Sequence, residues 1–233
     1  MKRLPLILLA VLGIAILGGC ATTPMVTKAD KFPLMYSERP NTIFVMPPIN
    51  STTAADAKEY YSTTIAEPLA FSGFYVIPME ITGELLKAQG IYDTEMIADQ
   101  PLGRFHEYFG ADAVLFTQIK KWDKSYAVLA SSLTVTVDAK LKSATSNKVL
   151  WEYSGTIVAD LSGSNSSSGN PLADLIAKAI VTAVTTAAAD YVPYARLANQ
   201  QLLLSVPFGK YHIRGGQDGQ DKLADLNSGK TYR

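Results

Sequence analysis

The first twenty residues constrain this chain most strongly. Two basic residues lie near its start, an apolar run follows over residues 4–17, and two glycines stand directly before Cys20. A basic start, an apolar stretch and small residues before a cleavage site are typical of a secretory signal peptide. A cysteine directly after the small residues indicates the bacterial lipoprotein type, in which the thiol is the nucleophile that accepts the lipid. We therefore expect removal of residues 1–19 and lipid attachment at Cys20.

Two other interpretations of this segment fit less well. A transmembrane anchor needs about 20 apolar residues, and the run over residues 4–17 is shorter. An ordinary secretory signal would leave Cys20 as a single unpaired thiol in an oxidising compartment. Asp directly after the lipidated cysteine favours retention in the inner membrane, so Ala21 predicts export to the outer membrane. The expected location is the periplasmic face of the outer membrane, with exposure at the cell surface as the open alternative.

The composition bounds the rest of the chain. Cleavage leaves 214 of the 233 residues, with 19 Lys and Arg (21 less the two near the start) against 21 Asp and Glu. This balance gives no basic excess, so we expect no binding to nucleic acid. Cys20 is the only cysteine, which excludes an internal disulfide and a cysteine-based metal site. We expect a polar tether over residues 20–40, a single domain over 41–212, and a polar, disordered tail over 213–233.

Strand and helix patterns alternate in the first half. Apolar residues recur every fourth position after residue 53, which predicts a helix that Pro68 should bend or end. The expected elements are strands at 42–46, 74–77 and 113–119, that helix after 53, and helices at 82–89 and 101–109. Such alternation predicts an α/β fold, with helices covering a sheet.

The second half indicates an antiparallel hairpin. Residues 133–141 alternate between apolar and polar, which predicts a strand with one face buried. A turn at 143–147 leads to a second strand at 149–153. Further expected elements are a mobile loop at 162–169, a long helix at 171–189 and a short helix at 194–203. The predicted fold is therefore α/β, a mixed β-sheet covered by helices, with an antiparallel hairpin in the second half.

The sequence shows no constellation for catalysis. The motifs of serine hydrolases, zinc proteases and phosphate-binding loops are absent. His106 and His212 have no acidic partners at metal-ligand spacing. Asp112, at the start of a strand, is interpreted as a hydrogen-bonded turn residue. We therefore expect no enzymatic activity, no cofactor and no metal.

The best candidate for a binding site is the loop 47–53. It joins a strand to a helix N-terminus, where free backbone N–H groups attract anions. The candidate residues are Asn50, Ser51, Thr52 and Thr53. Thr53 with Asp56 also resembles a capping box, and helix capping alone explains every one of these residue types. We favour the capping interpretation over ligand binding.

Five strings in the chain resemble a known family. They are FVMPPIN at 44–50, GFYVIP at 73–78, FGADAVL at 109–115, LWE at 150–152 and PFGKYH at 207–212. They are similar to a family of uncharacterised outer-membrane lipoproteins that includes a meningococcal surface antigen. The resemblance implies a fold akin to the N-terminal domain of TolB, distantly related to CsgG-type lipoproteins, and it brings no catalytic residues. Residues 143–147 depart from the family pattern, which leaves the geometry of the hairpin turn open.

Two functional hypotheses follow. The first is a membrane-tethered binding or assembly module for another envelope protein, for which the resemblance suggests a CsgG-like lipoprotein; self-association is left open. In this hypothesis the hairpin containing residues 133–141 contributes the partner surface. The second is a small-ligand or glycan-binding domain that uses the loop 47–53.

Overall fold

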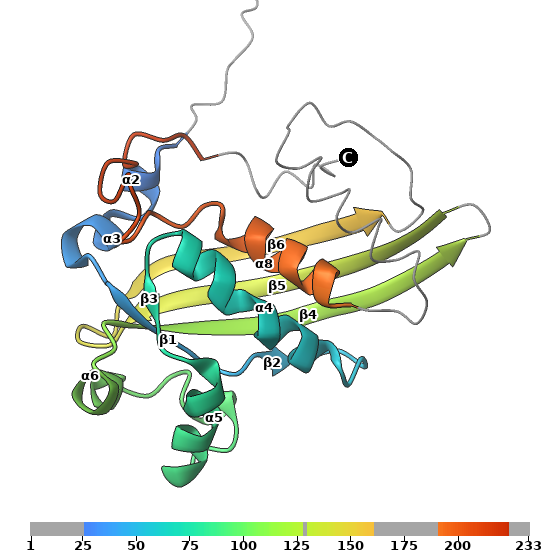
Figure 1. The fold of residues 1–233 in the computed structure, drawn as a ribbon, viewed down its shortest axis with the longest axis horizontal. Helices are drawn as coiled ribbons and strands as arrows, with labels where there is room; N and C mark the ends of the chain where they lie inside the picture. Colours follow the sequence, from blue (N-terminus) through green and yellow to red (C-terminus); the bar gives the residue numbers. More distant parts are fainter. Residues whose placement is uncertain (1–25, 128–129, 161–190, 224–233) are drawn as a thin grey trace, which may run out of the picture.

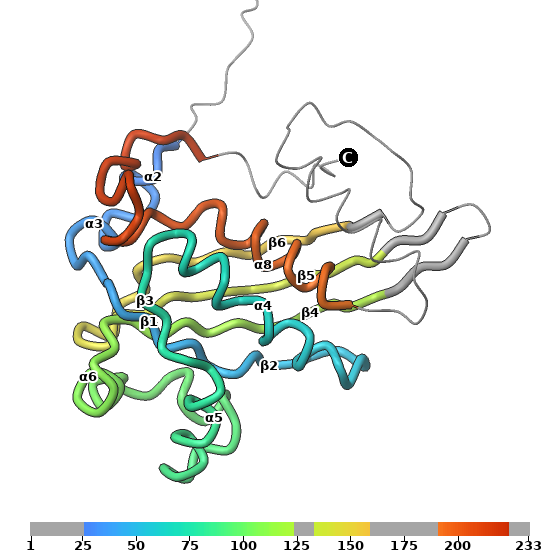
Figure 2. Tube along the Cα trace, in the orientation of Figure 1, coloured from blue at the N-terminus to red at the C-terminus, as the bar shows by residue number. Residues whose placement is uncertain are grey.

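A mixed β-sheet organises the fold. The computed structural model describes residues 26–127, 130–160 and 191–223, which are coloured in Figures 1 and 2. Among these residues the strand order is β3-β1-β4-β5-β6, and β2 also pairs with β4. The strands are β1 Thr42–Val45, β2 Ile49–Asn50, β3 Tyr75–Val76, β4 Ala113–Ala127, β5 Ala130–Ser143 and β6 Val149–Asp160. The helices are α2 Lys28–Lys31, α3 Pro33–Glu38, α4 Ala57–Phe71, α5 Met79–Ala88, the 3₁₀ turn η2 Thr94–Met96, α6 Gly103–Phe109 and α8 Val192–Leu203.

The sheet is parallel in its first half and antiparallel in its second. β1 runs parallel to β3 and β4, whereas β5 pairs antiparallel with β4 on one side and with β6 on the other. The alternation over residues 133–141 is confirmed, because its apolar side chains are buried and the polar ones between them are not. The predicted α/β fold with a mixed sheet and an antiparallel hairpin is therefore correct. The hairpin strands are longer than predicted.

Two helices, α4 and α8, lie side by side across one face of the sheet (Figure 1). The predicted apolar stripe of α4 is fully buried there; it consists of Ala57, Tyr61, Ile65 and Leu69. Asn199 of α8 is also buried, and its Nδ2 donates to the Tyr61 carbonyl (2.9 Å) and to Thr64 Oγ1 (2.8 Å). Pro68 does not end α4, which continues to Phe71, because a proline in the last turn removes only one backbone bond.

A smaller apolar cluster lies on the opposite face of the sheet. Successive side chains of β1 point to opposite faces of the sheet, so Phe44 lies on this face and its neighbours lie on the other. The Phe44 ring meets Phe105 of α6 edge-on, at 4.9 Å between ring centroids. Gly110 ends α6 at φ 64°, as the sequence predicts, whereas α5 begins at Met79, three residues before its predicted start. This cluster packs α5 and α6 against β1 and β4.

Two segments predicted outside the domain belong to it. Residues 26–40, expected as part of the tether, form α2 and α3, and Phe32 between them is buried. Residues 213–223, expected in the disordered tail, hydrogen-bond to α2; the Lys28 N–H donates to the Asp221 carbonyl (2.9 Å). Each segment is polar when its sequence is considered alone, but in the structure the two segments contact each other.

Several predictions fall outside the described residues. They concern the signal peptide 1–19, lipid attachment at Cys20, the loop 162–169, the helix 171–189 and the end of the tail at 224–233. No helix among the described residues is long and apolar enough to cross a membrane.

Candidate functional site

The polar side chains of the loop 47–53 bond mainly to one another and to nearby groups. The Asn50 side chain accepts from the Thr52 N–H (3.1 Å) and hydroxyl (2.8 Å), and its Nδ2 donates to the Ala54 carbonyl (2.8 Å). The Ala54 N–H donates to Thr52 Oγ1 (3.1 Å), and Gln118 Nε2 donates to Ser51 Oγ (2.8 Å). This set of bonds closes the loop around its own backbone. It leaves few polar groups of Asn50, Ser51 and Thr52 for a ligand.

The start of α4 differs from the predicted capping arrangement. The helix begins at Ala57, so Asp56 and not Thr53 occupies the N-cap position. The Asp56 side chain makes no capping hydrogen bond. Its backbone is already in the right-handed helical region, whereas a capping residue normally has extended backbone. The capping box is therefore absent, because the turn through Asn50 and Thr52 delays the helix.

A cavity of about 210 Å³ lies away from this loop. It is lined by Glu38, Pro40, Asp112, Thr145 and Ser146. Asp112 is engaged there as the sequence predicts, since its Oδ2 accepts from the Asn41 and Thr42 N–H groups, each at 2.9 Å. Its carboxylate thus fixes the start of β1 beside β4.

The two histidines lie apart. His106 Nδ1 lies 3.0 Å from the Ala111 carbonyl oxygen and 4.0 Å from Asp112 Oδ1. His212 lies against the Phe208 ring, in the C-terminal part of the domain. Within the described residues no three His, Cys, Asp or Glu side chains come together as a metal-binding group would require.

The hairpin strands β4, β5 and β6 present a polar face on the side away from α4 and α8. Ser154 Oγ donates to Asp138 Oδ1 (2.7 Å), and Lys120 Nζ lies 3.3 Å from Asp138 Oδ2. The Thr136 and Thr156 hydroxyls bond across β5 and β6 (2.9 Å). These pairs link the three strands on this polar face.

β6 lies at one edge of the sheet, and β3 lies at the opposite edge. Among the described residues β6 pairs only with β5, whereas β5 has partners on both sides. The start of β6 is covered by the N-terminal segment, where Phe32 packs on Trp151. Farther along, residues 153–158 carry no charged side chain, and Val158 is 40% exposed. The sequence predicts the alternation of apolar and polar residues in β5, but it does not predict which strand lies at the edge of the sheet.

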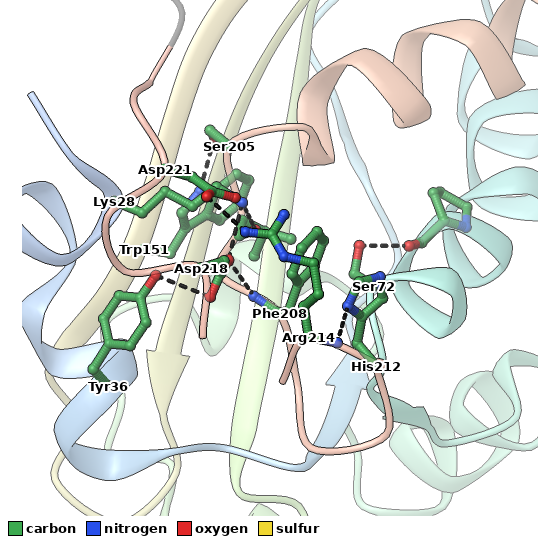
Figure 3. A network of polar contacts seen from close by, with 12 residues as sticks. Lys28, Tyr36, Ser72, Trp151, Ser205, Phe208, His212, Arg214, Asp218 and Asp221 are labelled. Carbon is green, nitrogen blue, oxygen red and sulfur yellow. Dashed lines mark hydrogen bonds and ion pairs between the residues drawn. The ribbon is translucent and has the colours of Figure 1, made fainter. Parts of the chain in front are cut away.

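The two ends of the described domain are joined by polar contacts (Figure 3). We call residues 26–31 and 205–223 the terminal clasp. Lys28 Nζ lies 3.1 Å from Asp218 Oδ2, donates to the Val206 carbonyl (3.0 Å) and lies 4.5 Å from the Phe208 ring centroid. The Lys28 side chain is 7% exposed and that of Asp218 is fully buried. The ion pair is therefore shielded from water and salt.

Asp218 organises the surrounding loop. Its Oδ2 accepts from the Phe208 N–H (2.9 Å) and its Oδ1 from the Tyr36 hydroxyl (3.2 Å). Burial, and then the charge of Asp218, raise the pKa of Tyr36 above its usual range. At the surface, the hydrogen bond from Arg214 lowers the pKa of Asp221, and the two side chains lie 2.7 Å apart.

The clasp was missed by the sequence reasoning. Asp218 lies in a stretch rich in Gly, Gln and Asp that gave no signal for burial. The only hint was the string at 207–212, whose Phe208 stacks on His212 with ring centroids 3.6 Å apart. A backbone contact locks the same string to the end of α4, since the Tyr211 N–H donates to the Gly73 carbonyl (3.0 Å).

The fold and the site define a mixed α/β sheet domain that shows no metal cluster in its described part. The family model described as "Putative lipoprotein GNA1162-like" matches residues 32–210, and the chain belongs to this family. The "Putative lipoprotein NMB1124/NMB1162" of Neisseria meningitidis serogroup B is 31% identical over 152 residues, which are 65% of this chain and 69% of that protein. The family resemblance drawn from the five strings is thereby confirmed.

Solved structures show more distant similarity. The crystal structure of lipoprotein GNA1162 from Neisseria meningitidis is 29% identical, covers 64% of this chain and 100% of its own, and has a TM-score of 0.49. The PelC dodecamer from Paraburkholderia phytofirmans is 18% identical, with coverage of 66% and 87% and a TM-score of 0.36. The LpoB C-terminal domain from Salmonella enterica is 18% identical, with coverage of 56% and 97% and a TM-score of 0.34.

Proposed function

We propose that this chain is a lipoprotein of the bacterial outer membrane that binds or assembles another envelope protein. The lipid on Cys20 would hold the domain at the periplasmic face, and Ala21 would direct export away from the inner membrane. The proposal is supported by the basic, apolar and small-residue pattern that ends at Cys20 and by membership of a family described as lipoproteins. The resemblance suggests a CsgG-like lipoprotein as the partner.

The observation that supports the binding role is the edge position of β6, which pairs only with β5 in the part of the chain that the structure describes. An edge strand offers unpaired N–H and C=O groups to which another chain can add a strand. Charged side chains commonly protect such an edge, but residues 153–158 have none. Asp138, Lys140 and Lys142 of the hairpin are charged, but they lie on the central strand β5 and cannot block this edge. Within the hairpin that the sequence suggested as the partner surface, we therefore propose β6 as the strand that contacts the partner.

A pair of lysine substitutions separates edge pairing from contact with the polar face. Val158 of β6 and Thr134 of β5 are direct neighbours across the strand pair, so their side chains share one face. Val158→Lys places a charge on the free edge strand, and Thr134→Lys places the same charge on its central neighbour. We expect Val158→Lys to lower the yield of crosslinked complex in intact cells several-fold and Thr134→Lys to leave it near the wild-type level.

The stability of both variants is checked by thermal unfolding, since each must remain folded for the comparison. Equal losses of complex in both would show that the face, and not the edge, contacts the partner. Wild-type yield for Val158→Lys would remove β6 from the interface. A crosslinked product with twice the mass of the chain would identify the partner as a second copy.

A small-ligand or glycan-binding function is the second candidate. It would use the loop 47–53, where α4 begins without a side-chain cap. The internal bonds of Asn50 and Thr52 weigh against it, as does the position of the cavity at Asp112 on a different part of the surface. We therefore rank it below the assembly function.

A further inference from the structure

Large apolar side chains are exposed around the contact between the end of α4 and the C-terminal segment. Their exposed fractions are 71% for Phe71, 55% for Tyr75, 64% for Tyr211 and 92% for Ile213. Single exposed apolar residues are common, but a group of large ones on one part of a surface marks an interaction site. We call these four residues the aromatic patch.

Hydrogen bonds through Gly73 and Asn41 hold the segments that carry the patch next to one another. Gly73 lies two residues from both Phe71 and Tyr75, and its carbonyl accepts from the Tyr211 N–H (3.0 Å). The Tyr75 N–H donates to the Asn41 carbonyl (2.9 Å), and Asn41 Nδ2 lies 3.4 Å from the Tyr211 hydroxyl. The patch is thus built from β3, the end of α4 and the clasp.

Two basic residues lie next to the C-terminal members of this patch. Lys210 lies over the Tyr211 ring at 5.8 Å from the centroid, and Arg214 follows Ile213 in the chain. The segments 26–41 and 204–223, which build this end of the domain, contain six Lys and Arg against four Asp and Glu. The mature chain as a whole has a small acidic excess, so this end is more basic than the average of the chain, with Lys28 paired to Asp218 and Arg214 paired to Asp221. Aromatic rings flanked by Lys and Arg are the composition that lies at the surface of a bilayer.

The lipid attachment point lies close to the same end. Val26 pairs with the clasp through its carbonyl, which accepts from the Leu223 N–H (2.9 Å). Only six residue steps separate Cys20 from Val26, so the chain between them spans at most about 22 Å. In Figure 1 the start of α2 and residues 205–223 (red) lie at the same end of the molecule, with the tips of the hairpin strands β4 and β5 at the other. A lipid at Cys20 would hold this end, and not the hairpin, near the membrane.

We propose that the aromatic patch docks on the membrane surface, with Tyr211 and Ile213 at the level of the headgroups and Lys210 against anionic ones. This inference rests on lipid attachment at Cys20, as in the proposed function. Docking would orient the tethered domain, so that β6 is held away from the bilayer and open to a partner. A protein partner on the patch is the competing occupant, and the short tether favours the bilayer.

The test attaches spin labels to the lipidated full chain and measures how deeply each label lies in the membrane. A nitroxide spin label on Ile213→Cys is compared with one on Ile81→Cys, since Ile81 is also exposed (52%) but lies on α5. A second matched pair is Tyr211→Cys and Tyr92→Cys, exposed at 64% and 73%. An acylated Cys20 cannot take the label, so the new thiol is the only target. The protein is reconstituted in vesicles of phosphatidylethanolamine and phosphatidylglycerol.

We expect labels at positions 213 and 211 to collide several-fold more often with oxygen, which partitions into lipid, than with a water-soluble nickel chelate. Labels at positions 81 and 92 should show the opposite preference. Equal access of the chelate to positions 213 and 81 would overturn the proposal. Shielding of position 213 in native envelopes but not in vesicles would also overturn it, because a protein would then cover the patch. Flotation of the chain with the vesicles reports lipid attachment separately, so a failure of docking is distinguishable from a failure of the anchor.

Discussion

Lys28 and Asp218 show at the scale of single residues how two polar segments are fixed to the domain. A buried ion pair repays its desolvation only when its other bonding groups are satisfied. Here Asp218 has three donors and Lys28 has a carbonyl and an aromatic ring besides its partner. Removal of one member therefore leaves a buried charge, whereas removal of both does not.

A double-mutant cycle tests this balance. Asp218→Asn keeps the size of the side chain but removes the charge that faces Lys28, and we expect a loss of about 3–5 kcal/mol in the free energy of unfolding. Lys28→Met should also destabilise the protein. The double variant should lose about 1–3 kcal/mol less than the sum of the single losses, as measured by urea unfolding. Additive losses would show that the pair is not coupled.

Gly73 allows the close contact between α4 and the clasp. Its φ is 87°, and a Cβ on it would overlap the backbone nitrogen of His212. Gly90 has a similar φ of 74° but open space around it, so Gly90→Ala measures backbone strain alone, about 1–2 kcal/mol. We expect Gly73→Ala to lower the melting temperature clearly more than Gly90→Ala. Equal decreases in the melting temperature would mean that the clasp does not pack closely against Gly73.

At the scale of elements, the position of β5 decides how the hairpin responds to change. Thr136 lies in a strand with partners on both sides, at the site opposite Thr156. Proline in a central strand removes a ladder bond, so Thr136→Pro should unfold the domain. Thr136→Ala keeps the N–H and loses only the hydroxyl contact, which should cost about 0.2–1 kcal/mol. Circular dichroism distinguishes the two, and a folded Thr136→Pro variant would contradict the central placement of β5.

The sequence predicts those elements whose pattern is local. The apolar stripe of α4 and the alternation of β5 could be predicted from the sequence, because each depends only on which face of a single element is buried. The edge position of β6 could not be predicted, since alternation indicates which face of a strand is buried and not which strand lies beside it. The clasp depends on contacts between residues 190 positions apart, such as Lys28 and Asp218, which neither segment reveals alone. In the candidate loop the polar residue types were noted, but the turn through Asn50 replaced the expected cap at Thr53.

At the scale of the whole molecule, the two proposed surfaces lie on different parts of the domain. The aromatic patch and the clasp lie at the end where the chain from Cys20 enters, whereas residues 153–158 of β6 continue along the sheet away from it (Figure 1). This arrangement would let one end contact the bilayer while the sheet edge contacts another protein. Both proposals depend on lipid attachment at Cys20.

Fractionation of the Cys20→Ala variant tests that dependence most directly. Cells producing the wild-type chain or the variant are separated into inner and outer membranes, and each fraction is washed at high salt to remove peripherally bound protein. We expect the wild-type chain to remain with the outer membrane, because its lipid resists the wash, and the variant to be absent from that fraction. A Cys20→Ala chain that still floats with washed outer membranes would contradict the lipid anchor.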